Sequence, residues 1–561
     1  MFPVGDSHAE PRRLPPGYYA DNVLAVCAVV DRRYGDVLTE SERELIDELR
    51  RLDEAARRLW VRLVSRRGPL FRRDRLSYPE VGDIDRALAR LVEAGFVDEG
   101  ASAPIEERLA VLRVPELRAL ARTCLIDPAV TARRKTEWMT TLRDHVDDAA
   151  LRAALDRIST VVRPLRLAEL EVLRLLFFGD LDHDWSAFVV SELGIVRYET
   201  VALDRASRFF SDRRAIDDML ALYRFRHRLA TTDDLDQIVA MARQAATAEW
   251  HAVARPRLER TVVRVARGLE RHGRCDDALA LYDAATTPPA RERRARLLAD
   301  RGRLADAIAL CHEIVEAPRD ESEAVFAPRF LHRLRRARGE RMPPPPRRRR
   351  PRRTLRIERA PVGLKEAAGL KEAAPIEELV LEALGGQGFF AENFLWRAIF
   401  GLAFWDIVFA PVAGAFQHPF QVGPFDLGAH FRPPREAAIT QRLTELKGED
   451  DLRPRLLSVW RDKHGIANPF VGWRSWEPIA LACSRLTGRQ VAWVCDRLSR
   501  DPRRYSRGFP DLFLFDTASP GFRLLEVKGP NDQLRPEQGA WIDHLNAGGL
   551  PTEIVDVRWS G

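Results

Sequence analysis

The sequence contains few cysteines, and they lie far apart. Among 561 residues there are six, none in a Cys-x-x-Cys pair: Cys27, Cys124, Cys275, Cys311, Cys483 and Cys495. Zinc sites and disulfide frameworks both need cysteines at short, regular spacings. We therefore expect reduced thiols in the protein core and no structural zinc site.

Long apolar runs are missing as well. No stretch of eighteen consecutive apolar residues occurs, so no segment has the length of a membrane-spanning helix. The opening residues, MFPVGDSHAEPRRLPPG, also lack the apolar stretch of a signal peptide. We expect a soluble, intracellular protein that does not associate with membranes.

Positive charge is distributed unevenly. The net charge is +7, but residues 333–359 hold thirteen arginines against Glu340 and Glu358, a local charge of +11 that leaves −4 for the remainder. Basicity of the whole chain therefore does not by itself indicate a nucleic-acid partner. In RMPPPPRRRRPRR, residues 341–353, stiff prolines stand beside like charges that resist burial. We assign residues 341–374 to a linker, which either holds DNA electrostatically or is simply solvated.

Residues 1–105 are expected to form the first of three or four domains, because a chain of this length exceeds a single core. After an irregular Pro-rich segment, residues 1–20, apolar residues at helical spacing cover Ser41–Leu52, Glu54–Val64 and Asp83–Ala94. Gly95 ends the last helix and Phe96 starts a strand, an order that resembles a winged helix. Such modules contact duplex phosphates or serve only as packing units. The candidate DNA contacts are Arg66, Arg67, Arg72, Arg73 and Arg75.

Residues 106–160 are expected to form a second DNA-binding element. Two short amphipathic helices within residues 111–146, joined by a loop, resemble the SAP-like helix-loop-helix fold. Arg133, Arg134 and Lys135 open the second helix. A basic helix N-terminus offers N–H groups and positive charge to phosphates, so we expect duplex binding here.

Residues 161–340 have helical periodicity almost throughout. The segment GRCDDALALY at residues 273–282 recurs as GRLADAIALC at residues 302–311, a shift of 29 residues. This repeat predicts stacked helical pairs that resemble tetratricopeptide repeats. They form either a peptide-binding groove or a rigid spacer. We favour the spacer, because only two copies are visible.

The stretch from Arg507 to Trp541 carries the chemistry. Its two apolar runs, Leu512–Phe515 and Phe522–Leu525, flank a six-residue loop and predict a hairpin. If Phe515 faces Phe522, Asp511 lies opposite Glu526, with Cβ atoms about 4.5–5.5 Å apart. Carboxylates this close repel one another unless a cation is present or one of them keeps its proton. Their oxygens suit Mg²⁺ or Mn²⁺.

Lys528 adds an ammonium group to this pair. Side chains alternate along a strand, so Lys528 projects on the same face as Glu526 while Val527 points into the core. A bound metal lowers the pKa of a coordinated water, and a nearby lysine can orient that water or hold a phosphate. Together these groups can catalyse phosphodiester hydrolysis. Gln538 is expected to face the site from a helix that Pro536 opens and Gly548-Gly549 ends, before a last strand, Thr552–Val557. Basic residues just before Asp511 lie within reach of a scissile phosphate: Arg503, Arg504 and Arg507.

The last domain, residues 375–561, is expected to begin with a helix, Glu377–Leu384. A long apolar segment follows in which Glu392 and Asp406 are the only acids, and carboxylates on so apolar a helix are costly to bury without partners. We expect Asp406 to cap or brace a nearby helix. In the loop-like residues 421–439, Arg432 and Arg435 contact either substrate or only the protein surface.

Two sets of residues carry a family resemblance. Asp511, the Glu526-Val527-Lys528 tripeptide and Gln538-x-x-Trp541 resemble the PD-(D/E)XK nuclease pattern. The longer segments GFPDL and EVKGPNDQLRPEQGAW resemble the VRR-NUC domain of Fanconi-associated nucleases, whose order of winged helix, SAP-like element and helical repeats is also similar. The resemblance implies a mostly α N-terminal part followed by an α/β nuclease domain. It also implies one or two Mg²⁺ or Mn²⁺ ions, held by Glu392, Asp511, Glu526 and Val527.

The resemblance further implies a 5′-flap endonuclease and 5′-to-3′ exonuclease that acts on flaps and branched or duplex DNA ends in interstrand-crosslink repair, with self-association on DNA as an open question. The cysteines lack the spacing of the family's N-terminal ubiquitin-binding zinc finger, so we do not expect recruitment by ubiquitin, and this architecture fits a bacterial member located with the nucleoid in the cytoplasm. A eukaryotic member would be nuclear. Two rival hypotheses are a DNA-binding scaffold without turnover and a helical-repeat adaptor for protein partners. The presence of Asp511, Glu526 and Lys528 argues against the scaffold. The adaptor hypothesis gives the basic segments no role, which argues against it.

Overall fold

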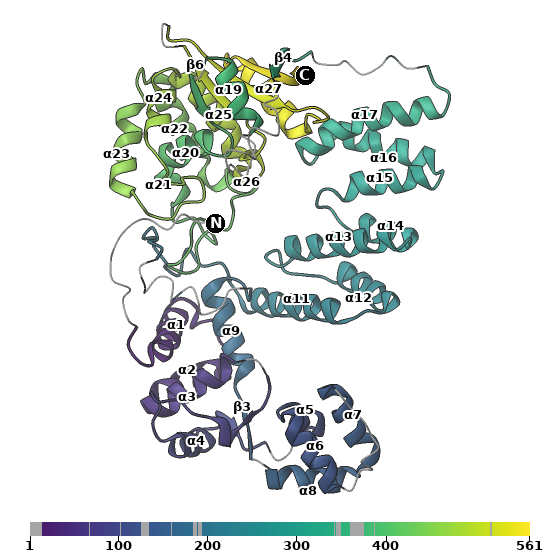
Figure 1. Cartoon of the computed structure of the whole chain (residues 1–561), viewed down its shortest axis with the longest axis vertical. Helices are drawn as coiled ribbons and strands as arrows, with labels where there is room; N and C mark the ends of the chain where they lie inside the picture. The colour runs from purple at the N-terminus through teal and green to yellow at the C-terminus, as the bar shows by residue number, and fades with distance from the viewer. Residues whose placement is uncertain are drawn as a thin grey trace. The chain divides into compact units, whose positions relative to one another are not determined.

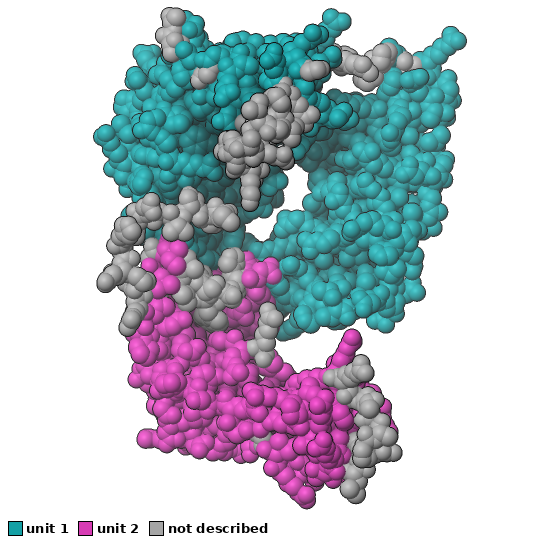
Figure 2. Space-filling model, in the orientation of Figure 1, with its two compact units in different colours: residues 1–5, 196–561 teal, residues 6–195 magenta. Residues whose placement is uncertain are grey.

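The structure is a computed structural model. It describes residues 14–560 except 67, 101–102, 125–133, 159, 183–187, 189–192, 194, 342, 344–348, 359–374, 386 and 517–518. The chain divides into two compact units, residues 6–195 and residues 196–561 together with 1–5 (Figure 2). Among the described residues, no helix is long and apolar enough to cross a membrane.

The unit of residues 6–195 is built on capped helices. The helices are α1 (Tyr18–Tyr34), α2 (Glu40–Arg51), α3 (Glu54–Val64) and α4 (Ile84–Glu93). Asp53 and Asp83 accept N–H groups in the first turns of α3 and α4, and Thr39 forms a capping box with Glu42 at α2. These three helices confirm the sequence prediction. Helix α1 differs from it, because it begins within the Pro-rich segment expected to be irregular.

The SAP-like helices are inserted into the winged-helix domain rather than appended to it. The strands β1 (Phe71–Arg72), β2 (Val97–Asp98) and β3 (Val161–Pro164) form one sheet in the order β1-β3-β2. Helix α9 (Leu167–Phe178) then packs on α1 and α2. The inserted helices, which have a core of their own, are α5 (Ile105–Ala110), α6 (Val114–Thr123), α7 (Lys135–His145) and α8 (Asp148–Ile158). The N-terminal domain thus extends past the boundary expected near residue 160.

The second unit begins with a stack of antiparallel helices (Figure 1). They are α11 (Arg213–Thr231), α12 (Leu235–Thr247), α13 (Arg255–Arg271), α14 (Cys275–Asp283), α15 (Ala290–Asp300), α16 (Leu304–Glu316) and α17 (Glu321–Ala337). Each helix from α13 on packs against the next. Gly273 and Gly302 each have a φ of 75°, which a residue without Cβ adopts freely, just before α14 and α16. The two copies seen in the sequence are therefore structurally equivalent turns.

A mixed sheet organises the C-terminal domain. Its strands are β4 (Arg352–Glu358), β5 (Gly388–Phe390), β6 (Leu512–Phe515), β7 (Phe522–Lys528) and β8 (Thr552–Ser560), in the order β4-β8-β7-β6-β5. Strand β4 lies inside the segment expected to be a linker, and it pairs in parallel with β8. Ion pairs of Arg352 with Asp556 (3.1 Å) and Arg353 with Glu553 (3.3 Å) explain how a strand this basic joins the sheet.

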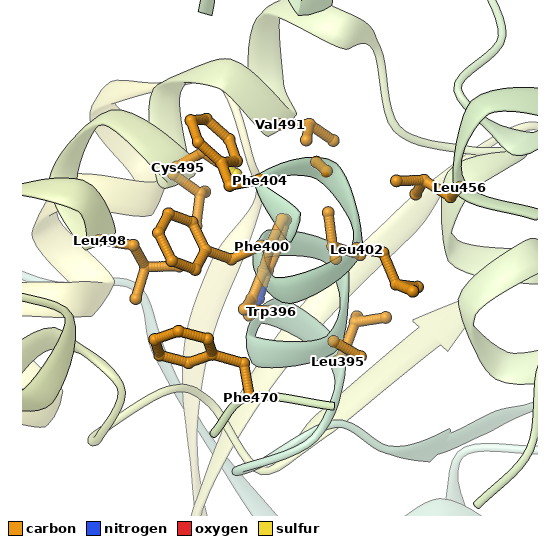
Figure 3. Packing of buried hydrophobic residues seen from close by; sticks show 14 of the residues in the cluster. Leu395, Trp396, Phe400, Leu402, Phe404, Leu456, Phe470, Val491, Cys495 and Leu498 are labelled. Atoms are coloured by element: carbon orange, nitrogen blue, oxygen red, sulfur yellow. The ribbon is translucent and has the colours of Figure 1, made fainter. Parts of the chain in front are cut away.

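Helices cover both faces of this sheet. On one face α19 (Ile376–Ala383) covers Leu512, Leu525 and Val527. On the other, Phe513, Leu524 and Trp541 join a large core around α20 (Leu395–Ala403), in which Phe400 packs beside Cys495 and Leu498 (Figure 3). The remaining helices are α21 (Trp405–Val408), α22 (Glu436–Gly448), α23 (Arg453–Lys463), α24 (Glu477–Cys483), α25 (Gly488–Arg500), α26 (Pro502–Tyr505) and α27 (Pro536–Ala547). All six cysteines are free thiols, as predicted, and four are buried.

A close backbone approach between α22 and α25 yields a stability prediction. A Cβ added to Gly488 would lie 1.9 Å from the backbone carbonyl oxygen of Leu446, whereas one added to Gly448 meets nothing within 4 Å. Overpacking of this kind costs about 1–3 kcal/mol. We expect Gly488→Ala to lower the thermal midpoint of unfolding and Gly448→Ala to leave it unchanged or raise it slightly. Equal effects of the two substitutions in differential scanning calorimetry would contradict this packing.

Candidate active site

The β6–β7 hairpin has the predicted register. Phe515 pairs with Phe522, and Leu512 pairs with Leu525. One step beyond this ladder, Asp511 Oδ2 accepts a 2.7 Å hydrogen bond from the backbone N–H of Val527. The strand pairing therefore holds Asp511 beside Glu526, as the sequence predicts.

Lys528 and Gln538 complete this cluster. Lys528 Nζ lies 2.7 Å from Glu526 Oε1 and donates a 3.1 Å hydrogen bond to Gln538 Oε1. Gln538 also accepts the backbone N–H of Arg535 (3.0 Å), which fixes the amide at the first turn of α27. Glu526 is 0% exposed, Lys528 8% and Asp511 9%. Four polar side chains from two strands and one helix are thus buried together, which places all four predicted residues in one site.

Burial makes the two carboxyl groups reluctant to ionise. It raises the pKa of Asp511 to about 8, an effect that the nearby charges of Glu526 and Glu392 increase and the Val527 N–H and Lys528 oppose. Burial also raises the pKa of Glu526, against the opposing effect of Lys528. No described residue donates a hydrogen bond to Glu526 Oε2. This is the electrostatic signature of a site whose counter-charge comes from outside the chain.

The sequence predicted that Glu392 lies on a buried apolar helix, and this prediction is wrong. Glu392 stands in the turn between β5 and α20 and is exposed, so the argument from the cost of burial does not apply to it. Strand β5 brings it to the site instead. The backbone N–H groups of Ala391 and Glu392 both donate to the carbonyl oxygen of Asp511, at 2.8 and 3.3 Å.

These groups fit a divalent cation. Two buried carboxylates, one with an oxygen that no described donor satisfies, are the hard oxygen ligands that such ions take. The side chain of Val527 packs in the core, so this residue can offer an ion only its backbone carbonyl oxygen. Among the described residues no three His, Cys, Asp or Glu side chains converge as a finished metal site. Asp511 and Glu526 therefore form the centre of the candidate site, with Glu392 beside them.

The basic residues before Asp511 have separate roles. Arg504 is bound to the helical stack, through Asp320 (2.9 Å) and Ser322 Oγ (3.0 Å) on α17. Arg503 and Arg507 are exposed and form no ion pair with any described residue. A cluster around Arg260 on α13 was not among the residues predicted from the sequence. Partial loss of hydration lowers the pKa of Arg260, and the positive charges of its neighbours lower it further: Arg257, Arg503, Arg226 and Arg264.

The basic residues of the N-terminal unit that were predicted to contact DNA differ in whether they are already paired within the protein. Arg72 is buried and paired with Asp74 and Glu116, each at 2.6 Å, so its guanidinium braces the domain and is withdrawn from any phosphate. Arg73 pairs with Asp85 (2.8 Å), and Arg75 pairs with Glu116 (2.7 Å). Arg66 donates to the Tyr78 hydroxyl (2.8 Å), Lys135 to the carbonyl of Ala110, and Arg134 precedes α7. Arg67 and Arg133 lie outside the described residues.

Three further polar residues prove to be structural. Asp406 pairs with Arg442 of α22 at 2.9 Å, which confirms its expected bracing role. Arg432 pairs with Glu436 (2.7 Å) and Asp496 (2.8 Å). Arg435 is buried against Asp426 (2.6 Å) and the ring of Phe431. Neither arginine is available to a substrate.

Comparison with known proteins decides the family. A model of the FAN1 HTH domain matches residues 17–98, and a model of the VRR-NUC domain matches residues 447–559. The Fanconi-associated nuclease 1 homolog of Pseudomonas aeruginosa is 32% identical over 97% of this chain and 96% of its own length. The chain belongs to the Fanconi-associated nuclease family. The rice homolog is 27% identical over 96% of this chain but 62% of its own length.

A solved structure agrees with this assignment. The crystal structure of paFAN1 bound to 2nt 5′flap DNA with gap superposes with a TM-score of 0.83 and 31% identity, over 98% of this chain and 100% of that one. The expected fold class and family are therefore confirmed for this Fanconi-associated nuclease. Within it, the matched VRR-NUC region holds Asp511, Glu526, Lys528 and Gln538, while Glu392 lies before that region.

The raised pKa of Asp511 predicts how the metal-free protein responds to pH. The unfolded chain ionises this carboxyl near its ordinary pKa, but the folded protein does so only near 8, so stability falls as the pH rises between these values. Asp511→Asn removes the titration and keeps an acceptor for the Val527 N–H. In EDTA we expect it to raise the thermal midpoint more at about pH 8.5 than at about pH 5.5. Asp406→Asn, at an exposed ion pair, is the matched control, and a similar pH-dependent gain there would refute the explanation.

Proposed function

We propose that this Fanconi-associated nuclease hydrolyses phosphodiester bonds of DNA that carries a 5′ flap, with Mg²⁺ or Mn²⁺ as its cofactor. The observation that carries the proposal is the buried set of Asp511, Glu526 and Lys528 on one hairpin, closed by Gln538. A bound divalent ion would supply Lewis-acid stabilisation of the phosphate and a water of lowered pKa. Family membership supports a DNA nuclease, and the carboxylates support a divalent cofactor.

Each residue of the set has a role that its position permits. The ionised carboxylates of Asp511 and Glu526 would hold the cation, with Glu392 near enough to share it or to order the surrounding water. Lys528 stands at the edge of the pair, where its ammonium can orient the attacking water or neutralise a phosphate oxygen. Gln538 keeps the Lys528 ammonium in that position.

The preference for a flap rests on similarity and on charge. The related paFAN1 was solved bound to 5′ flap DNA with a gap, and this chain matches it along almost its whole length. Arg503 lies just before Asp511 in the sequence. Its positive charge also acts on Arg260, so it belongs to the arginine cluster on α13. Burial and the positive charges of its neighbours lower the pKa of Arg260, and phosphates bound beside the cluster would relieve the repulsion. We extend the proposal to 5′-to-3′ exonuclease action and to crosslink repair on family grounds.

The rival hypotheses receive less support. A scaffold without turnover has no need to bury two carboxylates beside an ammonium, because the buried charges destabilise the fold. An adaptor would use the helical stack alone and would leave the nuclease hairpin unexplained.

Cleavage of a labelled 5′ flap tests the proposal directly. With Mg²⁺ or Mn²⁺ we expect cleavage that EDTA abolishes. Asp511→Ala should lower the rate by about a thousandfold or more, because it removes a charge that holds the cation. Asp511→Ala should keep its affinity for the flap in fluorescence anisotropy, and Asp406→Ala, outside the site, should cleave normally. Metal-independent cleavage, or full activity of Asp511→Ala, would overturn the proposal.

The arginine cluster predicts opposite effects on affinity and on stability. Arg260→Gln relieves repulsion among like charges, so we expect a higher thermal midpoint without DNA. It also removes one phosphate contact, so binding of flap DNA should weaken and its dependence on salt should lose about one unit of slope. Arg271→Gln, an exposed residue of the same helix, is the control. An unchanged salt slope for Arg260→Gln would exclude phosphate binding by the cluster.

A further inference from the structure

A pocket of about 770 Å³ lies between the helical stack and the nuclease domain. Residues of α15 and α17 line one wall, and residues of α25, α26 and α27 line the other. Its volume lies within the range of about 300–1,000 Å³ that is usual for binding sites. Of its lining residues, the function proposed above uses only Arg503.

The wall of the helical stack is an aromatic pair among arginines. The rings of Phe326 and Phe330 stack with centroids 4.8 Å apart and an interplanar angle of 26°. The guanidinium of Arg296 lies 4.7 Å from the centre of the Phe326 ring, and that of Arg333 lies 4.5 Å from the centre of the Phe330 ring. Phe330 is buried, while Phe326 is partly exposed and lines the pocket.

The nuclease wall has the same composition. The guanidinium of Arg497 lies 4.6 Å from the centre of the Trp541 ring and 4.9 Å from that of Tyr505. Arg497 is held in place by Glu321 of α17 at 2.6 Å. Both walls therefore present planar aromatic and guanidinium groups to the same space.

The charge of the pocket is positive after internal pairs are removed. Glu292 pairs with Arg296 and Glu321 with Arg497. Arg329, Arg333, Arg503 and Arg507 also line the pocket without an ion pair to a described residue, and they outnumber the two remaining acids of the lining, Asp501 and Glu537. The occupant that such a space favours is flat and apolar in one part and anionic in another.

The pocket is continuous with the active site through α27. Pro536, Glu537 and Trp541 line it, and Gln538, in the same turn of helix, holds the ammonium of Lys528. A polymer seated in the pocket would therefore lie next to the site of hydrolysis, with α27 between them.

We propose that this pocket binds unpaired nucleotides of the flap strand and that their bases stack on the wall formed by Phe326 and its arginine neighbours. The inference rests on the proposed function and deepens it by assigning a base-dependent step. Phosphate binding needs cations alone, whereas aromatic and guanidinium planes beside a basic surface are how proteins hold single-stranded DNA without regard to its sequence. The substrate class is single-stranded DNA at least one nucleotide long.

Two flap substrates that differ only in their bases test the proposal. Both carry a 5′-phosphate and the same duplex, but the flap of one has thymine bases and that of the other has abasic residues. We expect wild type to have a KM about tenfold lower for the flap with bases, since a stacked base contributes an effect of this order. Phe326→Leu should lose most of that difference, with little change in kcat and little change on the abasic flap. Arg336→Ala, an exposed residue of α17 that does not line the pocket, is the control.

The outcomes separate this inference from the proposed function. Equal KM values of wild type for both flaps, or an equal loss by Phe326→Leu on both, would overturn the stacking site while leaving the nuclease assignment intact. Absence of cleavage with either flap in Mg²⁺ and Mn²⁺ would overturn the proposed function instead. Binding of both flaps to Asp511→Asn, measured by anisotropy, would then still decide the stacking. If Phe326→Leu lowers the thermal midpoint, its kinetics no longer report on stacking alone. The difference in KM of wild type between the two flaps then decides whether bases stack in the pocket.

Discussion

The repulsion between two buried carboxylates on neighbouring strands is the constraint on which the nuclease domain depends. Burial raises the pKa of both Asp511 and Glu526; the charge of Glu526 adds to this effect at Asp511, and the charge of Glu392 adds to it at Glu526. The fold opposes this with a strand N–H for Asp511 and an ammonium for Glu526. The N–H group and the single ammonium do not neutralise two carboxylates, so the site favours a bound cation. Structure around the hairpin serves to keep this unfavourable arrangement in place, which is why a large aromatic core lies directly behind it.

The arginines of this protein separate into two groups. Several serve as braces: Arg72 inside the N-terminal domain, Arg435 beneath a loop, and Arg497 and Arg504 between the nuclease domain and α17. A second group, Arg329, Arg333, Arg503 and Arg507, lines the pocket beside α27, and Arg503 also adds its charge to the cluster around Arg260. Arginines without an ion pair therefore lie beside the candidate active site, although they are not confined to it. Net charge alone conceals this, because the paired arginines contribute to it equally.

The helical stack acts as more than a spacer in this arrangement. Glu199, which precedes α11, accepts a hydrogen bond from the indole N–H of Trp405 (2.6 Å) and forms an ion pair with Lys463 (2.7 Å), both in the nuclease domain. At the other end, Asp320 and Glu321 of α17 are tied to α26 and α25. Fixing both ends of the stack to the nuclease domain sets the width of the pocket between them. Because each helix from α13 on packs against the next, the stack is a continuous connection between these two fixed ends, which a flexible linker would not provide.

Local patterns in the sequence determined much of this protein. Alternation and turn residues were enough to predict the β6–β7 register and hence the meeting of Asp511, Glu526 and Lys528, because both strands are adjacent in the chain. Apolar residues at helical spacing likewise predicted α2 to α4, and a repeated segment that begins with glycine predicted the helical stack. Only the tertiary structure decided that β3 completes the N-terminal sheet, that β4 joins the nuclease sheet, that Glu392 reaches the site from a turn, and which arginines are paired. These depend on contacts between residues far apart in the sequence, and neither the spacing of residue types nor their local propensity encodes which distant carboxylate a given arginine will meet.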